Sequence, residues 1–308
     1  MAGLAILCSG QGRQSSDMFD SLRQYPEAAA IERKICSLGF SVKDSVSPAL
    51  LFANHYAQPL ICLYQIMAWS VLAEELPEVE LFAGYSLGEL SAYACAGFID
   101  ADTLLYLAST RGQLMSAVAQ PPQGMLAVLG LTRRQVKPIA DEFRAFTAIR
   151  NGEQHLIFGM KQESIDGFRD AVLALGATRV VRLPVSVAAH TPFLKEAAQA
   201  FDKELKKVNI RRGIAPVLSG IGAERIYDRS GMLAALSAQI QQTIDWQGCL
   251  EAALACGCRV FLELGPGNSL ARMLHEDFPN VEVRALSEFN DPKAAAKWAQ
   301  KALQRQGR

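Results

Sequence analysis

The chain has 308 residues and a mass of 33.5 kDa, long enough for one large domain or for a large domain that carries a smaller one. Half of the residues are hydrophobic and 20% are charged, a composition typical of a protein that folds in water. The 31 Lys and Arg residues balance 31 Asp and Glu residues, so the formal net charge is zero. This balance excludes a general nucleic-acid or anionic-membrane binder, and any partner must be recognised by a local surface.

Residues 1–9 predict a first strand rather than a targeting segment, because they lack a basic region and a small-residue cleavage site. The most apolar later stretch, residues 61–73, is too short to cross a membrane. Seven cysteines, among them Cys8, Cys62 and Cys95 within apolar runs, predict buried free thiols and a cytoplasmic protein. The two cysteines that are separated by a single residue have the wrong spacing for zinc, so we expect no metal site.

Short apolar runs alternate with helix-length periodic segments through most of the chain, a pattern typical of a parallel sheet covered by helices. In chain order, the strands expected in this sheet cover residues 4–8, 81–83, 215–219 and 259–264. Between them, the order of elements changes to that of a ferredoxin-like unit. We therefore expect an α/β fold in which a small ferredoxin-like subdomain, residues 124–187, is inserted into a large α/β domain formed by residues 1–123 and 188–308.

The elements expected within the insertion follow the order strand, helix, strand, strand, helix, strand. They are a strand over 125–131, a helix over 132–144, two strands around Asn151-Gly152, a helix over 162–175 and a strand over 178–187. After the insertion, the Lys- and Arg-rich segment 293–308 predicts a solvated terminal helix.

Residues 84–88, Gly-Tyr-Ser-Leu-Gly, match the pattern of a nucleophile elbow, in which a serine stands on a sharp turn between a strand and a helix. The pattern alone arises by chance in about one chain of this length in ten. Its context is more specific, because an apolar strand over 79–83 precedes it and a helix over 89–98 follows. Ser86 is the candidate nucleophile, and we expect the amide of Leu87 to point toward an oxyanion. The alternative is an ordinary strand-to-helix turn.

His190 is the best placed of the 4 histidines to serve as the base for Ser86. It follows the strand expected to end at Val187, and Thr191 and Pro192 mark the start of a helix directly after it. A helix N-terminus disfavours the cationic form of a neighbouring histidine, so the neutral imidazole is available to accept a proton. The alternative is a histidine in a capping region without a chemical role.

Arg111 interrupts the apolar face of a predicted helix over 103–118. The other members of that face are Leu104, Leu107, Ala108, Leu114, Met115 and Val118. A guanidinium aimed into a core is costly unless a carboxylate meets it. Either a protein carboxylate forms a structural salt bridge with Arg111, or the carboxylate arrives with the substrate. The second alternative predicts an acyl group with a free acid at its far end.

These features together resemble the malonyl-CoA:acyl-carrier-protein transacylases, from the N-terminus to about Phe289. The motifs that carry the resemblance are residues 9–14 after the first strand, Gln58-Pro59 opening a helix, residues 84–89, Arg111-Gly112, residues 183–187 leading to His190, and residues 263–267. The resemblance implies a hydrolase-like α/β domain with an inserted ferredoxin-like subdomain. It also implies ping-pong acyl transfer from malonyl-CoA, through a serine ester, to the phosphopantetheine-type thiol of an acyl carrier protein, without a permanently bound cofactor.

The resemblance also assigns roles to individual residues. Ser86 resembles the acylated nucleophile, His190 its base and Arg111 the clamp for the malonyl carboxylate. The other residues that it implies bind the intermediate or line the pocket: the amides of Gln11 and Leu87 as the oxyanion hole, Gln58 and Tyr85 in the pocket, and Gln239 where the family supplies a carbonyl that orients the histidine.

One departure bears on the choice of subfamily. Members that serve fatty-acid synthesis usually carry His immediately before the nucleophile, where this chain has Tyr85, and Pro-Ser is common where it has Ala188-Ala189. Tyr at that place is more similar to the acyltransferase (epsilon) subunit of bacterial malonate decarboxylase. The interpretation preferred from the sequence is therefore a malonyltransferase of that system, with other malonate decarboxylase subunits as further partners. A transacylase of fatty-acid or polyketide synthesis is the alternative.

Three other functions are compatible with parts of the sequence. A serine esterase would use Ser86, Asp245 and His275, although it leaves Arg111 without a purpose. A nucleotide binder would use the glycines of residues 10–12, but the third glycine of a dinucleotide fingerprint and the Lys-Ser/Thr of a P-loop are missing. A scaffold subunit could retain the fold without activity.

Overall fold

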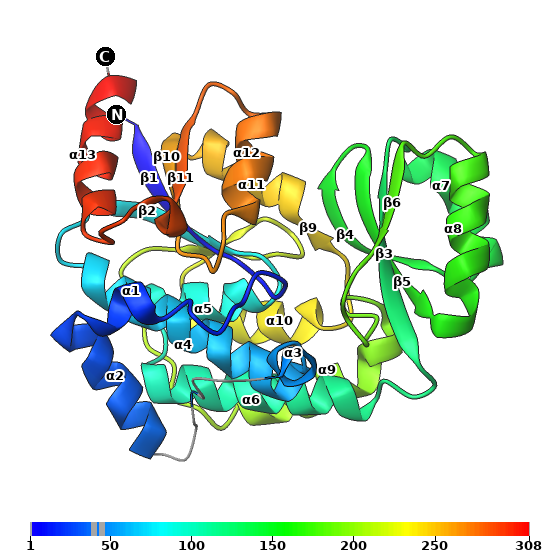
Figure 1. The fold of residues 1–308 in the computed structure, drawn as a ribbon, viewed down its shortest axis with the longest axis horizontal. Coiled ribbons are helices and arrows are strands. Elements are labelled where there is room, and N and C mark those ends of the chain that lie inside the picture. Colours follow the sequence, from blue (N-terminus) through cyan, green and yellow to red (C-terminus); the bar gives the residue numbers. More distant parts are fainter. Residues whose placement is uncertain (1, 38–41, 43–46, 308) are drawn as a thin grey trace.

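The structure, a computed structural model, describes residues 2–37, 42 and 47–307. Its first sheet contains six strands in the order β11 (Glu282–Ala285), β10 (Cys258–Glu263), β1 (Gly3–Cys8), β2 (Val79–Gly84), β7 (Val217–Leu218) and β8 (Arg225–Ile226) (Figure 1). All neighbours pair in parallel except β7 and β8. The strand predicted over 215–219 is thus only two residues long. Because β1 and β2 are parallel neighbours, the loops after them leave the sheet at the same edge.

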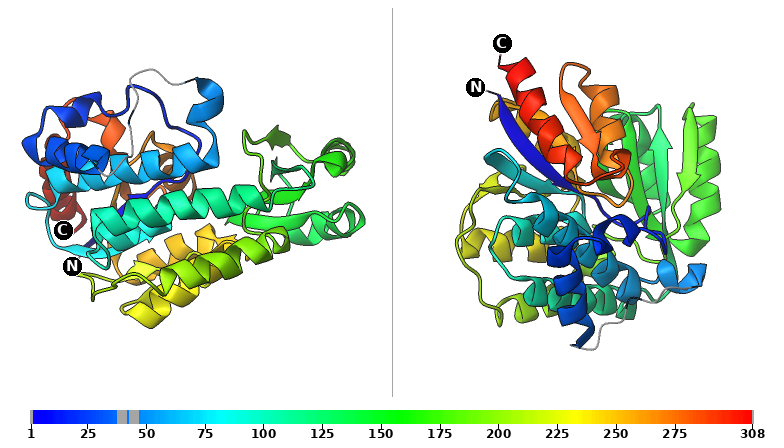
Figure 2. Two further views of the ribbon diagram at one scale, coloured as in Figure 1. Left: turned by 90° about the horizontal axis from the view of Figure 1, so that it is seen from below. Right: turned by 60° about the vertical axis from the view of Figure 1, so that its left-hand side comes forward.

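The second sheet contains five strands in the order β6 (Arg179–Arg182), β3 (Gln123–Leu129), β5 (His155–Lys161), β4 (Phe146–Gly152) and β9 (Ile244–Asp245). Helices α7 (Arg133–Glu142) and α8 (Ile165–Ala174), with the short helix η1 (Gln162–Ser164), complete the predicted ferredoxin-like order. Figure 2 shows this sheet and its helices as a lobe beside the first sheet. The two sheets confirm the predicted α/β fold class with a ferredoxin-like subdomain, while the exact division of the chain stays a prediction.

Two details of the second sheet differ from the prediction. β9 lies far outside residues 124–187 but pairs in parallel with β4, and two residues are too few to show a periodic pattern. The strand predicted over 178–187 ends at Arg182. Pro184 has no N–H to donate to a ladder, and residues 183–187 instead follow an irregular path along a cavity.

Thirteen α and three 3₁₀ helices are found among the described residues. Those not yet given are α1 (Asp20–Arg23), α2 (Pro26–Ser37), α3 (Pro48–Leu51), α4 (Asn54–Leu72), α5 (Leu87–Cys95), α6 (Ala101–Ala117), η2 (Pro192–Leu194), α9 (Lys195–Leu205), α10 (Arg229–Gln239), α11 (Trp246–Ala255), α12 (Ser269–Asp277), η3 (Leu286–Glu288) and α13 (Ala294–Gln306). No helix within this part of the chain is long and apolar enough to span a membrane.

Helix α4 begins earlier than the sequence motif predicts. Gln58-Pro59 was expected to open the helix, but the amides of Tyr56 and Ala57 already donate to the carbonyl oxygen of Ala53. Pro59 therefore lies inside the helix, and Gln58 lies in its second turn rather than at its start. The correction matters for the site, because a side chain within a helix is held more rigidly than one at a frayed end.

Helix α13 is amphipathic rather than simply solvated. Its small side chains Ala295, Ala296, Ala299 and Ala302 are buried, and the helix packs against β10 and β1. The prediction of a solvated terminal helix was therefore wrong for the alanine face. The small alanines recur at helical spacing, but the lysines between them make this apolar stripe hard to see in the sequence.

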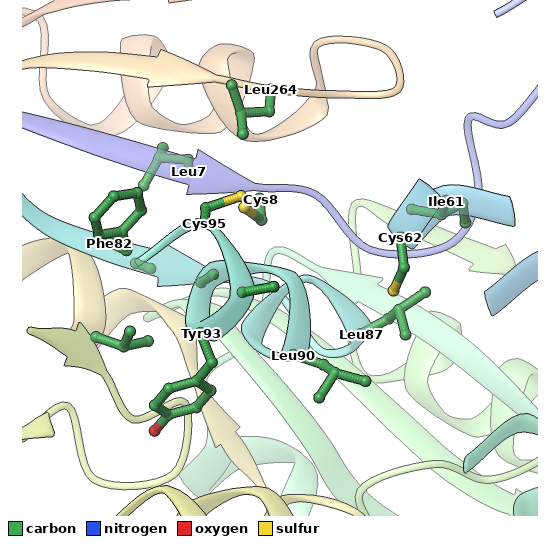
Figure 3. Close-up of a cluster of buried hydrophobic side chains, with 14 of the residues drawn as sticks. Leu7, Cys8, Ile61, Cys62, Phe82, Leu87, Leu90, Tyr93, Cys95 and Leu264 are labelled. Atoms are coloured by element: carbon green, nitrogen blue, oxygen red, sulfur yellow. The ribbon is translucent and has the colours of Figure 1, made fainter. Parts of the chain in front are cut away.

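A core of β1, β2, α4 and α5 supports the loop that carries Ser86 (Figure 3). Cys8, Cys62 and Cys95 are fully or almost fully buried in it as free thiols, as predicted. Figure 3 shows Cys8 and Cys95 side by side between β1 and α5. Ser91 of α5 donates a hydrogen bond to Cys62 of α4 at 3.3 Å. Helix α5 is thereby held between β1 on one side and α4 on the other.

Candidate active site

Ser86 stands on a strained turn between β2 and α5. Its φ of 56° and ψ of −112° are unusual for a residue with a side chain and cost of order 1–3 kcal/mol. The flanking glycines permit the turn. A Cβ on Gly88 would lie 2.0 Å from the carbonyl oxygen of Cys8, and one on Gly84 would lie 2.0 Å from the carbonyl carbon of Gly88. The two glycines are thus required because the backbone of β1 lies directly against Gly88 and the backbone of Gly88 lies directly against Gly84.

His190 is within hydrogen-bonding distance of the candidate nucleophile. Its Nε2 lies 2.7 Å from Ser86 Oγ, and its Nδ1 lies 2.6 Å from the carbonyl oxygen of Gln239. A carbonyl can only accept, so Nδ1 carries the proton and Nε2 accepts from the serine hydroxyl. The main-chain amide of His190 also donates to the carbonyl oxygen of Ile240 at 2.9 Å. Two consecutive carbonyls at the end of α10, those of Gln239 and Ile240, therefore set both the position and the tautomer of the imidazole.

The imidazole of His190 is buried, and burial lowers its pKa to about 3, with the charge of Arg111 as a second cause. The hydrogen bond to Gln239 opposes the shift. The result, a neutral base near pH 7, is the same as predicted, but burial and the charge of Arg111 are causes of the low pKa that the prediction did not name. Thr191 does stand at the N-cap position of η2, yet its hydroxyl donates to the carbonyl of Ala188 at 2.6 Å instead of capping the helix.

The guanidinium of Arg111, a residue of α6, also lies next to the Ser86 hydroxyl. Only 3% of Arg111 is exposed. Its Nη1 donates to Gln58 Oε1 at 2.9 Å, and its Nη2 lies 3.1 Å from Gln239 Oε1 and 3.5 Å from Ser86 Oγ. Gly112 allows this approach, since a Cβ there would lie 2.5 Å from the carbonyl oxygen of Asn54 in α4.

These partners decide between the two interpretations of Arg111. Every hydrogen-bond acceptor found for its guanidinium is neutral, and within the described residues no carboxylate forms an ion pair with it. Burial lowers its pKa to about 10, so the group remains cationic near pH 7. The structural salt bridge is therefore absent from the described part of the chain, and a buried cation beside the serine is poised for an anionic ligand.

Glu89, a residue that the sequence analysis did not select, lies behind Arg111 and is fully buried. Its Oε2 accepts hydrogen bonds from Gln239 Nε2 at 2.6 Å and from the amide of Gly220 at 3.0 Å. Burial raises its pKa to about 7, against the effect of these hydrogen bonds. The signal that singled out Arg111, a charge on an apolar helix face, was also present for Glu89.

Tyr85 connects the elbow to the second sheet. Its ring packs edge-on against Trp246 of α11, with ring centroids 5.4 Å apart. Burial raises the pKa of its hydroxyl, and a hydrogen bond with the Asn151 side chain opposes that shift. Asn151 belongs to β4, and sequence reasoning gave neither Asn151 nor Trp246 a role. Tyr85 thus forms one wall of the site while it holds the two sheets together.

Ser86, His190 and Arg111 open into one cavity of about 210 Å³ between the sheets. Its polar lining includes the predicted pocket residue Gln58 and the proposed oxyanion donors Gln11 and Leu87. Its apolar lining comes from both sheets and the loops beside them: Met115, Met125, Ile149, Ile157, Leu183, Val185, Val187 and Ala189. Every predicted site residue except Gln239 lines the cavity, and Gln239 contacts Arg111, Ser86 and His190 from behind.

The esterase triad is not assembled. Asp245 forms two hydrogen bonds with Arg150, at 2.8 and 2.6 Å, and caps α11 through the amide of Gly248. His275 lies exposed on α12. Because His190 occupies the hydrogen-bonding position beside Ser86, the interpretation with Asp245 and His275 is wrong.

Comparison with known proteins places this geometry in a family. The profile of the acyl transferase domain family matches residues 6–296. The chain is 30% identical over 275 residues to the polyketide biosynthesis protein PksE of Bacillus subtilis, covering 86% of this chain and 35% of that longer protein. It is 28% identical over 300 residues to the malonyl CoA-acyl carrier protein transacylase of Salmonella typhimurium, covering 94% of this chain and 97% of that protein.

A solved structure shows the same architecture. The complex of a type II polyketide-synthase acyl-carrier protein with its malonyl-transacylase matches with a TM-score of 0.89 and 25% identity, covering 97% of this chain and 99% of that chain. The chain therefore belongs to the acyl transferase domain family, and it is an acyltransferase.

Proposed function

We propose that the protein transfers a malonyl group from malonyl-CoA to the phosphopantetheine-type thiol of an acyl carrier protein, through an ester on Ser86. The observation that carries the proposal is the guanidinium of Arg111, buried 3.5 Å from Ser86 Oγ and hydrogen-bonded only to neutral partners. A free carboxylate at the far end of the acyl group would neutralise the charge of this guanidinium and accept two parallel hydrogen bonds from it. The relatives named as malonyl transacylases support the same substrate.

The first half of the reaction forms the acyl-enzyme. Ser86 Oγ attacks the thioester carbon while its proton moves to Nε2 of His190, and Nδ1 stays hydrogen-bonded to the carbonyl of Gln239. The oxyanion is bound by the amides of Gln11 and Leu87, of which Leu87 is the first residue of α5 and has no intrahelical acceptor. The C–S bond then breaks, and His190 returns the proton to the CoA sulfur.

The second half reverses these steps with another thiol. The carrier thiol loses its proton to His190 and attacks the ester carbon, and the C–O bond to Ser86 breaks as the serine regains the proton. No additional cofactor is needed. In this scheme residues 124–187 act as the small subdomain that covers the site, and residues 1–123 and 188–308 as the large domain that carries the nucleophile and base.

Fatty-acid or polyketide synthesis is the context that we prefer, because two of the proteins named above carry polyketide synthesis in their names and the third is named as a malonyl CoA-acyl carrier protein transacylase. Malonate decarboxylase is a second candidate that rests on the sequence alone, on Tyr85 before the nucleophile and on Ala188-Ala189 before His190. The two contexts share the malonyl-serine step and differ in the carrier. Competition between holo carrier proteins of the two systems for the malonyl-enzyme separates them.

Intact-mass spectrometry after mixing with malonyl-CoA tests the proposed function. We expect a malonyl adduct on the wild-type protein and none on Ser86→Ala, whose folding is retained because a turn hydroxyl contributes little stability. His190→Ala should slow adduct formation by about 100-fold or more, the range for a positioned base. His275→Ala is the matched control and should form the adduct at the wild-type rate. An adduct on Ser86→Ala, or slow acylation only in the control, would refute the assignment.

A further inference from the structure

A second cavity, of about 520 Å³, lies next to the acyl pocket. The two cavities share five lining residues: Gln11, Tyr85, Ile157, Leu183 and Val185. One side of the second cavity comes from the loops after β1 and β10 and from α12, and the other comes from β3, β5, β6 and the segment after β6. Figure 1 shows α12 beside the second sheet. The second cavity is therefore the continuation of the acyl pocket between the two sheets.

Two arginines line this second cavity, and neither forms an ion pair with another described residue. Arg13 lies in the loop after β1, and Arg272 lies in α12. The cavity has no carboxylate among its lining residues, so its charged lining is cationic. The carboxylates of Glu276 and Asp277, further along α12, do not line it. Two exposed guanidiniums without carboxylate partners favour an anion at this position.

Arg13 is held in place by its surroundings. Its Nε lies 3.4 Å from Ser269 Oγ. A Cβ on Gly267 would lie 2.8 Å from Cβ and 3.0 Å from Cγ of Arg13, so the arginine stem packs directly on that glycine. Ser269 precedes Arg272 by three residues in α12, which is close to one helical turn, so the two arginines lie on the same side of the cavity.

The remaining lining of the second cavity is mostly apolar or uncharged. It includes Phe52, Tyr85, Pro184, Leu270 and Met273. A neutral, flexible arm with amide groups fits such a surface, provided that an anionic group lies at the arginine end. A pantetheine thioester has this construction, because its thioester end must reach Ser86 and its other end carries a phosphate.

We propose that Arg13 and Arg272 bind the phosphate at the end of the pantetheine arm of the thioester while the arm lies in the second cavity. The inference rests on the proposed function and adds a phosphate site to it. CoA carries a diphosphate at this end of its arm, and a holo carrier protein carries a single phosphodiester, so both thioesters share the chemistry. The donor and acceptor half-reactions distinguish the two sources.

The donor arm of the test compares two malonyl thioesters. Malonyl-CoA carries the phosphates, and malonyl-N-acetylcysteamine has the same thioester without them. We expect Arg13→Gln and Arg272→Gln each to lower kcat/KM for malonyl-CoA by about five-fold, and the double variant by more than ten-fold, as loss of a charge-assisted contact implies. Malonyl-N-acetylcysteamine should react unchanged. Arg13→Lys should recover part of the loss.

Arg212→Gln serves as the matched control, since Arg212 is also exposed and lines neither cavity. It should leave both substrates unaffected. Equal losses for both thioesters in the Arg13 and Arg272 variants, or no loss for malonyl-CoA, would overturn the phosphate site. Failure of the wild-type protein to form an adduct from either thioester would instead refute the proposed function.

The acceptor arm identifies the source of the phosphate. The malonyl-enzyme of the double variant is mixed with a holo acyl carrier protein or with free pantetheine, which lacks phosphate. Slower transfer to the carrier protein, with unchanged transfer to pantetheine, supports one phosphate site that is used in both half-reactions. Unchanged transfer to both acceptors, together with the loss for malonyl-CoA, assigns the site to the CoA diphosphate. Equal slowing with both acceptors overturns the proposal.

Discussion

Glu89 and Gln239 share a 2.6 Å hydrogen bond that determines which way the Gln239 amide points. With Nε2 donating to the Glu89 carboxylate, Oε1 faces Arg111, 3.1 Å from its Nη2. The opposite orientation would bring two acceptor oxygens together on one side and two donor groups together on the other. Glu89 therefore acts on Arg111 through an intervening amide, which makes it a positioning residue that does not touch the substrate itself.

Replacing Glu89 by Gln tests this relationship. The new side chain keeps the volume but no longer dictates the orientation of Gln239, so Arg111 loses part of its support. We expect kcat/KM for malonyl-CoA to fall about ten-fold, a loss of about 1.4 kcal/mol, and the value for acetyl-CoA to change less. Glu263→Gln is the control, because Glu263 is equally buried but accepts from the amide of Ala271. A similar loss in the control would reduce Glu89 to a structural role.

The pH dependence of acylation gives a second test. Burial raises the pKa of Glu89 to about 7 and lowers that of His190 to about 3. As the pH rises through 7, Glu89 ionises and accepts more strongly from Gln239, while His190 is already neutral. We expect kcat/KM for malonyl-CoA to increase across this range in the wild type and to stay flat between about pH 5 and 8 in Glu89→Gln. An inflection near 6.5 that survives in the variant would mean that His190 titrates instead.

Arg111 is predicted to distinguish malonyl from acetyl groups. In Arg111→Ala, a malonyl carboxylate would be buried without a partner, which costs roughly 3–5 kcal/mol, or about two to four decades in kcat/KM. Acetyl-CoA has no carboxylate and should lose little. Arg111→Lys should recover only part of the preference, because an ammonium lacks the two-pronged geometry. The measurement is kcat/KM for both thioesters in the three proteins. Parallel losses for malonyl and acetyl would contradict a carboxylate clamp.

The contact between Tyr85 and Asn151 should contribute to the stability of the whole chain. Tyr85→Phe removes the hydroxyl but keeps the ring against Trp246, and we expect the free energy of unfolding to fall by about 1 kcal/mol. Asn151→Ala should have a similar effect, and the double variant little more than either single one. Urea unfolding of the four proteins completes the cycle. Strict additivity would show that the two side chains do not interact across the sheets.

The fold and the groups at the centre of the site could be predicted because local patterns determine them. The elbow at Ser86 needs glycines at fixed positions, and the buried guanidinium of Arg111 stands out from an apolar helix face. Each signal lies within one element and its immediate neighbours. The family resemblance drawn from these motifs was confirmed by the match over residues 6–296.

Contacts between distant elements could not be predicted in the same way. The link from Tyr85 to Asn151 joins the end of β2 in the first sheet to β4 in the second. The two-residue strand β9 also pairs with β4, and the ion pair from Asp245 to Arg150 joins residues that are 95 positions apart. The cause of the His190 pKa was also missed, because burial depends on elements from the whole chain. Among these missed site residues, only Glu89 had a local signal, a charged side chain on an apolar helix face.

The pairing of β9 with β4 has a consequence for protein engineering. A segment inserted between two points of a chain can normally be cut out or exchanged as a cassette, since all of its strands lie between the cuts. Here a cassette of residues 124–187 would leave Ile244–Asp245 behind, so the transplanted sheet would have an open edge at β4. A chimera that takes residues 124–187 from this chain must therefore carry β9 along with them, or β4 becomes an unpaired and aggregation-prone edge strand.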